Sequence, residues 1–283
     1  MDLKALIQRH FEPVVQSYTD KDAMLYALGV GAGGDPLDRR ELPYVYEGDL
    51  KAIPTLAVVL AYPGFWLRDP ALKIDWLKLL HGEQYLEFQR PLAACADVRG
   101  DFRVIGVADK GVEKGAVVFF EKRISAAADS APICTVRSTY FLRGDGGCGN
   151  YGEGLESPEP LPSREPDRVI DLPTLPQQAL IYRLSGDLNP IHADPRAAAA
   201  AGFDRPILHG LCTMGIVCRG LVGAVCDSAP ERLKSISLRF SSPVFPGELI
   251  RLEIFHEPEA IRFRARVVQR RVVILDRGRA TLF

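Results

Sequence analysis

Two side chains that can move protons lie five residues apart in the second half of the chain. Asp187 and His192 are separated by a segment that contains Asn189 and Pro190. Because proline disfavours helix for the residue before it, this segment is predicted to bend, and a bent loop can aim both side chains at one point. Hydration of a conjugated double bond needs a base that takes a proton from water and an acid that protonates the α-carbon. A carboxylate and an imidazole that converge on one water molecule can provide both.

A helix predicted downstream of this loop offers a third chemical element. The apolar stretch from Leu208 to Cys226 is interrupted by His209 and Arg219 and by four glycines, which indicates a buried core helix and argues against a membrane span. Gly210 lies where this helix is expected to begin, and its missing side chain lets a substrate approach the backbone. The first N–H groups of the helix are therefore candidates to stabilise negative charge on a thioester oxygen.

Other interpretations of these residues stay open on spacing alone. An Asp-x-Asn-Pro segment is also an ordinary turn with side-chain capping, and His192 could be a structural histidine. Asp194 precedes Pro195 and is predicted to cap an alanine-rich helix, without a chemical role. Two histidines and an aspartate could bind a metal ion, but their spacing matches no usual ligand motif, so no metal site is predicted.

Composition limits the classes of protein to which the chain can belong. Its 283 residues suit two domains, and 47% hydrophobic residues with 25% charged residues and a net charge of -1 describe a globular protein. This balance favours neither nucleic acid nor a membrane surface as a partner. The six cysteines form no C-x-x-C pair, and neither end carries a signal peptide or a peroxisomal address, so the expected location is the cytoplasm.

The chain is predicted to have two α+β halves joined by a linker. Four prolines among charges in the segment 157–167 predict a solvated connection, so the expected units are residues 1–156, a linker at 157–168, and residues 169–283. Each half is predicted to place a helix before an antiparallel sheet. The predicted strands are the β-rich or alternating runs at 102–111, 115–125, 131–144, 235–245, 248–257, 260–270 and 271–283.

Helices are also predicted outside the catalytic segment. The runs from Tyr18 to Leu28 and from Gln177 to Ser185 are helix-like, and the candidate central helix of the first half lies near Leu72 to Leu80. Two glycine-rich runs, 29–34 and 144–152, are predicted to be loops, because neither sits between a strand and a helix in the manner of a dinucleotide site.

Longer runs of sequence form a pattern that covers nearly the whole chain. The runs are Tyr182-Arg-Leu-Ser-Gly-Asp-Leu-Asn-Pro-Ile-His192, Ala201-Gly-Phe203, Pro206-Ile-Leu-His-Gly-Leu-Cys-Thr213, Tyr26-Ala-Leu-Gly-Val-Gly-Ala32, Tyr46-Glu-Gly48, Pro54-Thr55, Leu80-His-Gly-Glu-Gln-Tyr85 and Asp109-Lys-Gly111. The second-half runs resemble the signature of the (R)-specific enoyl-CoA hydratases, the MaoC-like hot-dog family. The first-half runs are similar to the N-terminal half of the hydratase unit of peroxisomal multifunctional enzyme type 2.

The resemblance implies a double hot-dog, an α+β fold of two fused halves, each with an antiparallel sheet wrapped round a central helix. It implies that Asp187, His192 and Gly210 are catalytic, with Asn189 beside them and Glu47 in a supporting role. It also implies that the N-terminal half has lost its catalytic residues and accommodates the acyl tail. The implied acyl-CoA contacts are His81, Gly82, Lys110, Asp187, Leu188, Asn189, Pro190, Ile191, His192, Gly210 and Phe240.

The secondary positions also have simpler interpretations. Lys110 could be a solvated turn residue, His81 and Gly82 could end a helix, and Phe240 could be an ordinary strand residue. The expected reaction is reversible hydration of a trans-2-enoyl-CoA to the (3R)-3-hydroxyacyl-CoA, in fatty acid β-oxidation or related metabolism, without metal or redox cofactor. Alternatives are a 3-hydroxyacyl thioester dehydratase, a thioesterase and a non-catalytic acyl-CoA binder. A homodimer is the commonest further assembly, and the sequence leaves it open.

Overall fold

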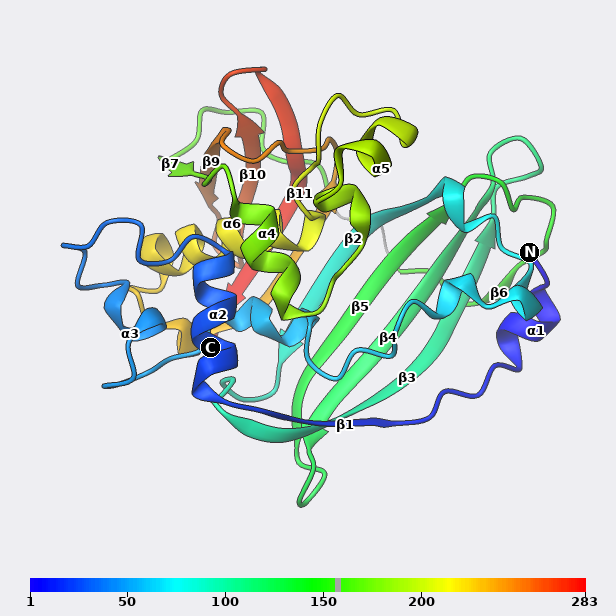
Figure 1. Cartoon of the computed structure of the whole chain (residues 1–283), viewed down its shortest axis with the longest axis horizontal. Helices are drawn as coiled ribbons and strands as arrows, with labels where there is room; N and C mark the ends of the chain where they lie inside the picture. Colours follow the sequence, from blue (N-terminus) through cyan, green and yellow to red (C-terminus); the bar gives the residue numbers. More distant parts are fainter. Residues whose placement is uncertain (156–158) are drawn as a thin grey trace.

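A computed structural model describes residues 1–155 and 159–283, and the strands in these residues form one antiparallel sheet of 11 strands (Figure 1). The strands are β1 (Val14–Tyr18), β2 (Leu79–Phe88), β3 (Ala96–Asp109), β4 (Ala116–Ala126), β5 (Pro132–Leu142), β6 (Tyr151–Gly152), β7 (Arg168–Pro173), β8 (Leu233–Phe240), β9 (Leu249–His256), β10 (Ile261–Val267) and β11 (Val272–Leu282). Their order is β1-β3-β4-β5-β2-β8-β11-β10-β9-β7, with β6 paired to β3.

Helices occupy the connections between the strands. The α-helices are α1 (Leu3–Ile7), α2 (Asp20–Gly29), α3 (Leu42–Val45), α4 (Gln178–Tyr182), α5 (Pro195–Ala200) and α6 (Gly210–Val225). The 3-10 helices are η1 (Pro54–Val58), η2 (Trp66–Arg68), η3 (Pro70–Leu72), η4 (Trp76–Lys78), η5 (Arg183–Ser185), η6 (Pro190–His192) and η7 (Pro230–Arg232). The predicted helices at α2, α4, α5 and α6 are confirmed, and so is the cap of α5, where Asp194 accepts a hydrogen bond from the backbone N–H of Arg196 at 2.8 Å.

The seven predicted strands are confirmed as β3, β4, β5, β8, β9, β10 and β11. The helix predicted near Leu72 to Leu80 is wrong. The segment contains the end of η3 and the 3-10 helix η4, which ends at Lys78. The strand β2 begins at Leu79, and from Gly82 onward buried residues alternate with half-buried ones. Lys73 has a left-handed backbone conformation with φ 51°, which ends the turn that begins at Pro70 and prevents a continuous helix. The alternative that Gly82 ends a helix is therefore also wrong.

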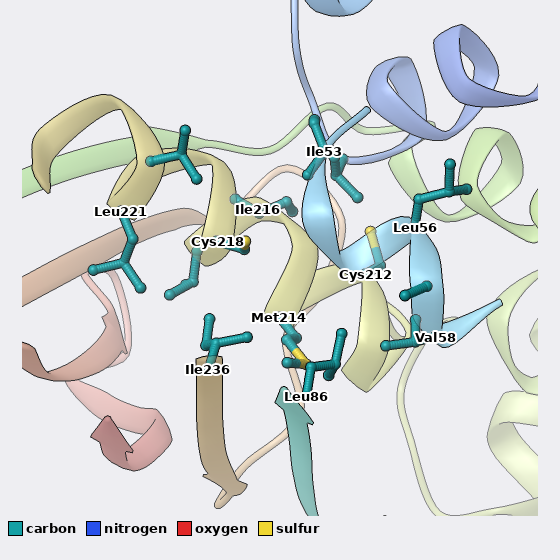
Figure 2. Packing of buried hydrophobic residues seen from close by; sticks show 14 of the residues in the cluster. Ile53, Leu56, Val58, Leu86, Cys212, Met214, Ile216, Cys218, Leu221 and Ile236 are labelled. Atoms are coloured by element: carbon teal, nitrogen blue, oxygen red, sulfur yellow. The ribbon is translucent and has the colours of Figure 1, made fainter. Parts of the chain in front are cut away.

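The helix α6 lies in the centre of the main hydrophobic core. Its side chains Cys212, Ile216 and Leu221 are fully buried. Figure 2 shows Cys212 and Ile216 beside η1 of the first half, and Met214 beside Leu86, which pairs with Ile236 across β2 and β8. Burying a side chain of this size contributes about 1.5–3 kcal/mol. The predicted apolar helix therefore joins the two halves as well as filling the second.

The two halves meet along the β2–β8 pair. Glu83 lies opposite Arg239 in the register, and the guanidinium Nε donates to the carboxylate at 2.8 Å. The helices α2 and α4, one from each half, also pack on each other, and the Gln178 side chain donates to the carbonyl of Gly29 at 2.6 Å. The continuous sheet and the helix pair hold residues from both halves at one place.

The first half has a smaller second core and, in the described residues, no long central helix. Segments between η1 and β2 cover its sheet instead, with Trp66 packed on Phe120 at 5.0 Å between ring centroids. The expectation of a central helix in each half therefore holds only for the second. A short 3-10 helix, η1, packs against α6 from the first half.

The predicted linker is partly described. Residues 159–167 have no helix or strand. Residues 157 and 158 of the linker, and the predicted boundary between 156 and 157, lie outside the described residues. The two glycine-rich runs form turns and loops, except that Gly29 ends α2 and β6 lies at the end of the second run. Among the described residues, every helix is too short or too polar to cross a membrane.

Candidate active site

The loop that carries Asp187 and His192 is bent, as predicted, and is held by its own side chains. The Asp187 carboxylate accepts from the backbone N–H of Asn189 at 3.1 Å, and the Asn189 side chain accepts from that of Ile191 at 3.3 Å. Pro190 then opens η6, which ends at His192. Both local hydrogen bonds are Asx turns, so this sequence shapes its own loop.

His192 is held in the tautomer that leaves a base available. Its Nδ1 lies 2.8 Å from the carbonyl oxygen of Ile207. A carbonyl only accepts, so Nδ1 carries the proton and Nε2 keeps a free lone pair. Burial lowers the pKa of His192, against smaller opposite effects of the Ile207 carbonyl and of Asp187. The ring is therefore neutral near pH 7 and can accept a proton.

Gly210 places a hydrogen-bond donor next to this base. It is the first residue of α6 and is exposed, so its N–H has no carbonyl partner within the helix. The helix dipole adds partial positive charge at the same end. A Cβ at this position would lie 3.2 Å from the ring of Phe240, which explains why a residue without a side chain fits.

His209 belongs to the same site, although the sequence analysis gave it no role beside Asp187 and His192. Its ring stacks on that of His192 with 3.6 Å between centroids, and its Nε2 lies 3.1 Å from the carbonyl oxygen of Asp187. Burial, and then the neighbouring His192, lower the pKa of His209 to about 4. Its position directly before Gly210 was the one feature of the sequence that could have indicated a role. Its partners His192 and Asp187 lie 17 and 22 residues earlier in the chain, and this spacing follows no helix or strand period.

Asp187, His192 and His209 form a cluster with possible metal ligands within 4.8 Å of one another. The donor types suit a metal ion, but the orientation of the two rings does not. A tetrahedral site needs lone pairs that converge on one point about 2 Å from each nitrogen. Lone pairs of imidazole lie in the ring plane, and these two planes are stacked at 26° and separated by 3.6 Å between centroids. The geometry favours proton transfer over metal binding.

Two predicted substrate contacts from the first half lie next to this cluster. The His81 ring packs on Phe240 at 4.9 Å between centroids, and burial lowers the pKa of His81 to about 4 although Asp187 acts in the opposite direction. Gly82 follows it in β2, where a Cβ would lie 2.2 Å from the ring of Phe141. Phe240 therefore lies beside both Gly210 and His81, which brings residues of both halves to one site.

The structure does not bring the other predicted residues into this cluster. Lys110 is exposed in the turn between β3 and β4, where its backbone N–H donates to Gly115 at 2.9 Å. Glu47 is exposed in the loop after α3 and is not part of the cluster of Asp187, His192 and His209. Leu188 is 60% exposed, so it can reach a ligand but is not buried in the site. The roles of Lys110 and Glu47 remain predictions.

A groove of about 860 Å³ lies away from this cluster. It runs between β2, β5 and β8 and the segment after β6, and its polar lining includes Glu83, Arg137 and Arg262. None of the clustered residues lines it. We assign no chemistry to this groove, because the base and the donor that a reaction needs lie elsewhere.

Comparisons with known proteins agree with the fold. A MaoC like domain matches residues 158–277, and an MFE-2 hydratase 2 N-terminal domain matches residues 16–144. A crystal structure of a MaoC-like dehydratase from Phytophthora capsici has a TM-score of 0.88 and 33% identity, and the match covers 100% of this chain and 99% of that chain. These matches define the class: a MaoC-like double hot-dog protein, so the predicted fold is confirmed.

Two curated relatives are similar over most of their length. Enoyl-CoA hydratase 2, peroxisomal, from Arabidopsis thaliana is 38% identical, with 92% of this chain and 88% of the relative covered. The 3-hydroxyacyl-thioester dehydratase Y of Mycobacterium tuberculosis is 40% identical, with 94% and 93% covered. The chain belongs to the enoyl-CoA hydratase 2 family.

Proposed function

We propose that this protein is a hydro-lyase that adds water across the double bond of a trans-2-enoyl-CoA and forms the (3R)-3-hydroxyacyl-CoA, reversibly, in β-oxidation or related acyl-CoA metabolism. One observation carries the proposal: a neutral His192 with a free Nε2 lies beside Asp187 and close to the start of α6, where the Gly210 N–H is unpaired. The family supports the substrate class and the (3R) product.

The reaction uses these groups in a balanced sequence. The Asp187 and His192 pair takes a proton from water as the water oxygen bonds to the β-carbon of the enoyl group. Electron density moves to the thioester oxygen, which the Gly210 N–H stabilises as negative charge develops. The proton then returns to the α-carbon. Since one polar cluster delivers both hydroxyl and proton, both add to the same face of the double bond.

The first half supplies the surroundings of the substrate in this proposal. His81 and Gly82 are adjacent to Phe240 and so can contact the acyl-CoA near the reacting carbons. Lys110 is proposed to contact a CoA phosphate, because its ammonium is exposed on a turn. Glu47 is proposed to order a loop over the site once substrate is bound. Space for the acyl tail is proposed where the first half lacks a long helix.

The opposite physiological direction is the nearest alternative. The relative from M. tuberculosis carries the name of a dehydratase, and hydration and dehydration pass through one transition state. A non-catalytic binder is disfavoured because the base and the oxyanion donor are both present in one site.

The test is the absorbance of the enoyl-thioester band with crotonyl-CoA and with trans-2-decenoyl-CoA, coupled separately to (3S)- and (3R)-specific dehydrogenases. We expect loss of absorbance and a product that only the (3R) enzyme accepts. No loss with either substrate, from protein with a folded circular dichroism spectrum, would contradict the proposal.

We also propose that the protein is cytoplasmic and forms a homodimer. All six cysteines are free, which suits a reducing compartment. The Arabidopsis relative is named peroxisomal, so cell fractionation must decide the location. Light scattering during size-exclusion chromatography measures the assembly, with twice the mass of 31.2 kDa expected for a dimer.

A further inference from the structure

The proposed reaction leaves one buried histidine of the site without a role. His209 is 1% exposed and lies at the N-cap of α6, directly before Gly210. Its Nε2 is 3.1 Å from the carbonyl oxygen of Asp187, so Nε2 carries the proton and donates it. This one side chain therefore links the backbone of the catalytic loop to the start of the helix.

Aromatic packing fixes the orientation of the His209 ring. The ring contacts His192 at 3.6 Å and Tyr182 at 4.9 Å between centroids. Tyr182 in turn packs on Tyr26 of α2 at 5.8 Å, and both tyrosines are fully buried. A rotation of His209 would therefore disturb a row of rings that begins in the first half of the chain and ends at His192.

The charge of His209 also suits the reaction. Its Nδ1 is buried and has no hydrogen-bond partner among the described residues, so a proton placed there would lack an acceptor. A neutral ring follows from this environment. A neutral neighbour does not repel the positive charge that develops on His192 when that ring takes a proton from water, whereas an imidazolium in stacking contact would.

We propose that His209 is a positioning residue for the hydration: it holds the backbone of Asp187, the ring of His192 and the Gly210 N–H in one geometry. The inference rests on the proposed function. His209 itself touches no reacting atom in this account, and it acts through its neighbours. A displacement of about 1 Å in such a site costs about 10²-fold in rate.

Two substitutions separate the hydrogen bond of His209 from its packing. His209→Phe keeps a flat ring and removes the donor, whereas His209→Gln keeps an N–H donor at a similar reach. His10→Phe is the matched control, because His10 is exposed. We expect His209→Phe to lower kcat by about 10²-fold with little change in KM. His209→Gln should recover part of this loss, and the control should match wild type.

A double-mutant cycle with Asp187→Asn tests whether His209 acts through the catalytic loop. In the Asp187→Asn background, His209→Phe should cost less than in wild type, because the catalytic carboxylate on the loop that His209 holds is already missing. Equal losses in both backgrounds would overturn the proposal. A kcat for His209→Phe within about twofold of wild type would overturn it too. If His209→Phe melts below the assay temperature, the same cycle is run with His209→Gln.

Nitrogen NMR of the histidines in the wild-type protein gives a readout that does not depend on turnover. We expect His209 to show the neutral Nε2–H tautomer and His192 the neutral Nδ1–H tautomer at about pH 7. A proton on Nδ1 of His209 would overturn the proposed tether. Wild-type protein that fails to hydrate any enoyl-CoA would remove the proposed function, while these tautomers would still decide whether His209 binds the Asp187 carbonyl.

Discussion

The two halves of the sheet differ in the helix that packs against them. In the second half, α6 has 16 residues and begins at the exposed Gly210, whose N–H has no partner within the helix. In the first half, η1 has five residues, and the Lys122 ammonium binds the carbonyls of Ala57, Val58 and Leu60 at 3.0, 3.0 and 2.6 Å. The open end of α6 can stabilise an oxyanion, whereas η1 is tied to β4 by a buried cation.

This difference explains how one sheet can support chemistry in one half and packing in the other. A reaction at a thioester needs donors that are unpaired until the substrate arrives, and an open helix start provides them. The first half instead contributes apolar walls and the rings of His81 and Tyr26. Substitutions in the second half should therefore change rate, and substitutions around Lys122 should change stability.

The largest expected effect belongs to Asp187→Asn. Loss of the carboxylate should lower kcat by about 10²–10⁴-fold, the range of general acid–base catalysis, with the melting temperature unchanged. Steady-state hydration of crotonyl-CoA measures this. Asp194→Asn is the matched control, because that residue caps α5 and an asparagine caps equally well. A variant at Asp187 that kept its rate would contradict a catalytic role and favour a binding protein.

The oxyanion donor can be removed with little change to the fold. Gly210→Pro deletes the N–H, and proline is well accepted at the first position of a helix. His209 already has φ -60° and ψ 138°, the conformation that a residue before proline prefers. We expect kcat to fall by about 10²–10³-fold. Gly210→Ala keeps the N–H and should lose less, so equal losses in the two variants would point to crowding against Phe240 instead.

The pH dependence follows from the lowered pKa of His192. The base must be unprotonated, so kcat/KM should be level near neutral pH and should fall only as the pH drops through a pKa below the ordinary value of about 6.5. Burial and the charge of Arg183 lower this pKa, while Asp187 opposes them. A pH–rate profile checks the prediction, and a fall that begins above about pH 6.5 would contradict it.

The smallest effect on rate is expected in the first half. Lys122→Met should leave three carbonyls without a partner and lower the free energy of unfolding by about 1–3 kcal/mol for each of them, while kcat changes little. Urea denaturation measures the stability, and Lys114→Met, at an exposed turn residue, is the control. A loss of rate as large as that of Asp187→Asn, without a loss of stability, would show that the two halves are not divided in this way.

The elements predicted from sequence are those whose pattern is local. The bent loop at Asn189 and Pro190 and the apolar run of α6 are set by neighbouring residues, so both were predicted correctly. The start of the strand β2 was missed because the charged residues spaced among apolar ones from Leu72 to Leu80 gave an amphipathic pattern that also suits a helix. Only its pairing with β5 and β8 decides between the two.

Within the site, the limit of sequence reasoning is set by tertiary contacts. The Asp187 and His192 pair is visible because five residues separate its members, whereas the stack of His192 on His209 depends on the chain returning after α5. The place of His81 beside Phe240 depends on the β2–β8 pairing. The resemblance to a family named these two positions, but no local pattern brings them together.

The most direct test of the central claim, that one cluster delivers both hydroxyl and proton, is hydration of a trans-2-enoyl-CoA in heavy water followed by NMR of the product. We predict one deuterium at C2, on the face that received the hydroxyl, and the (3R) configuration at C3. Addition to opposite faces would require a proton donor across the substrate from Asp187 and His192, and would contradict the account.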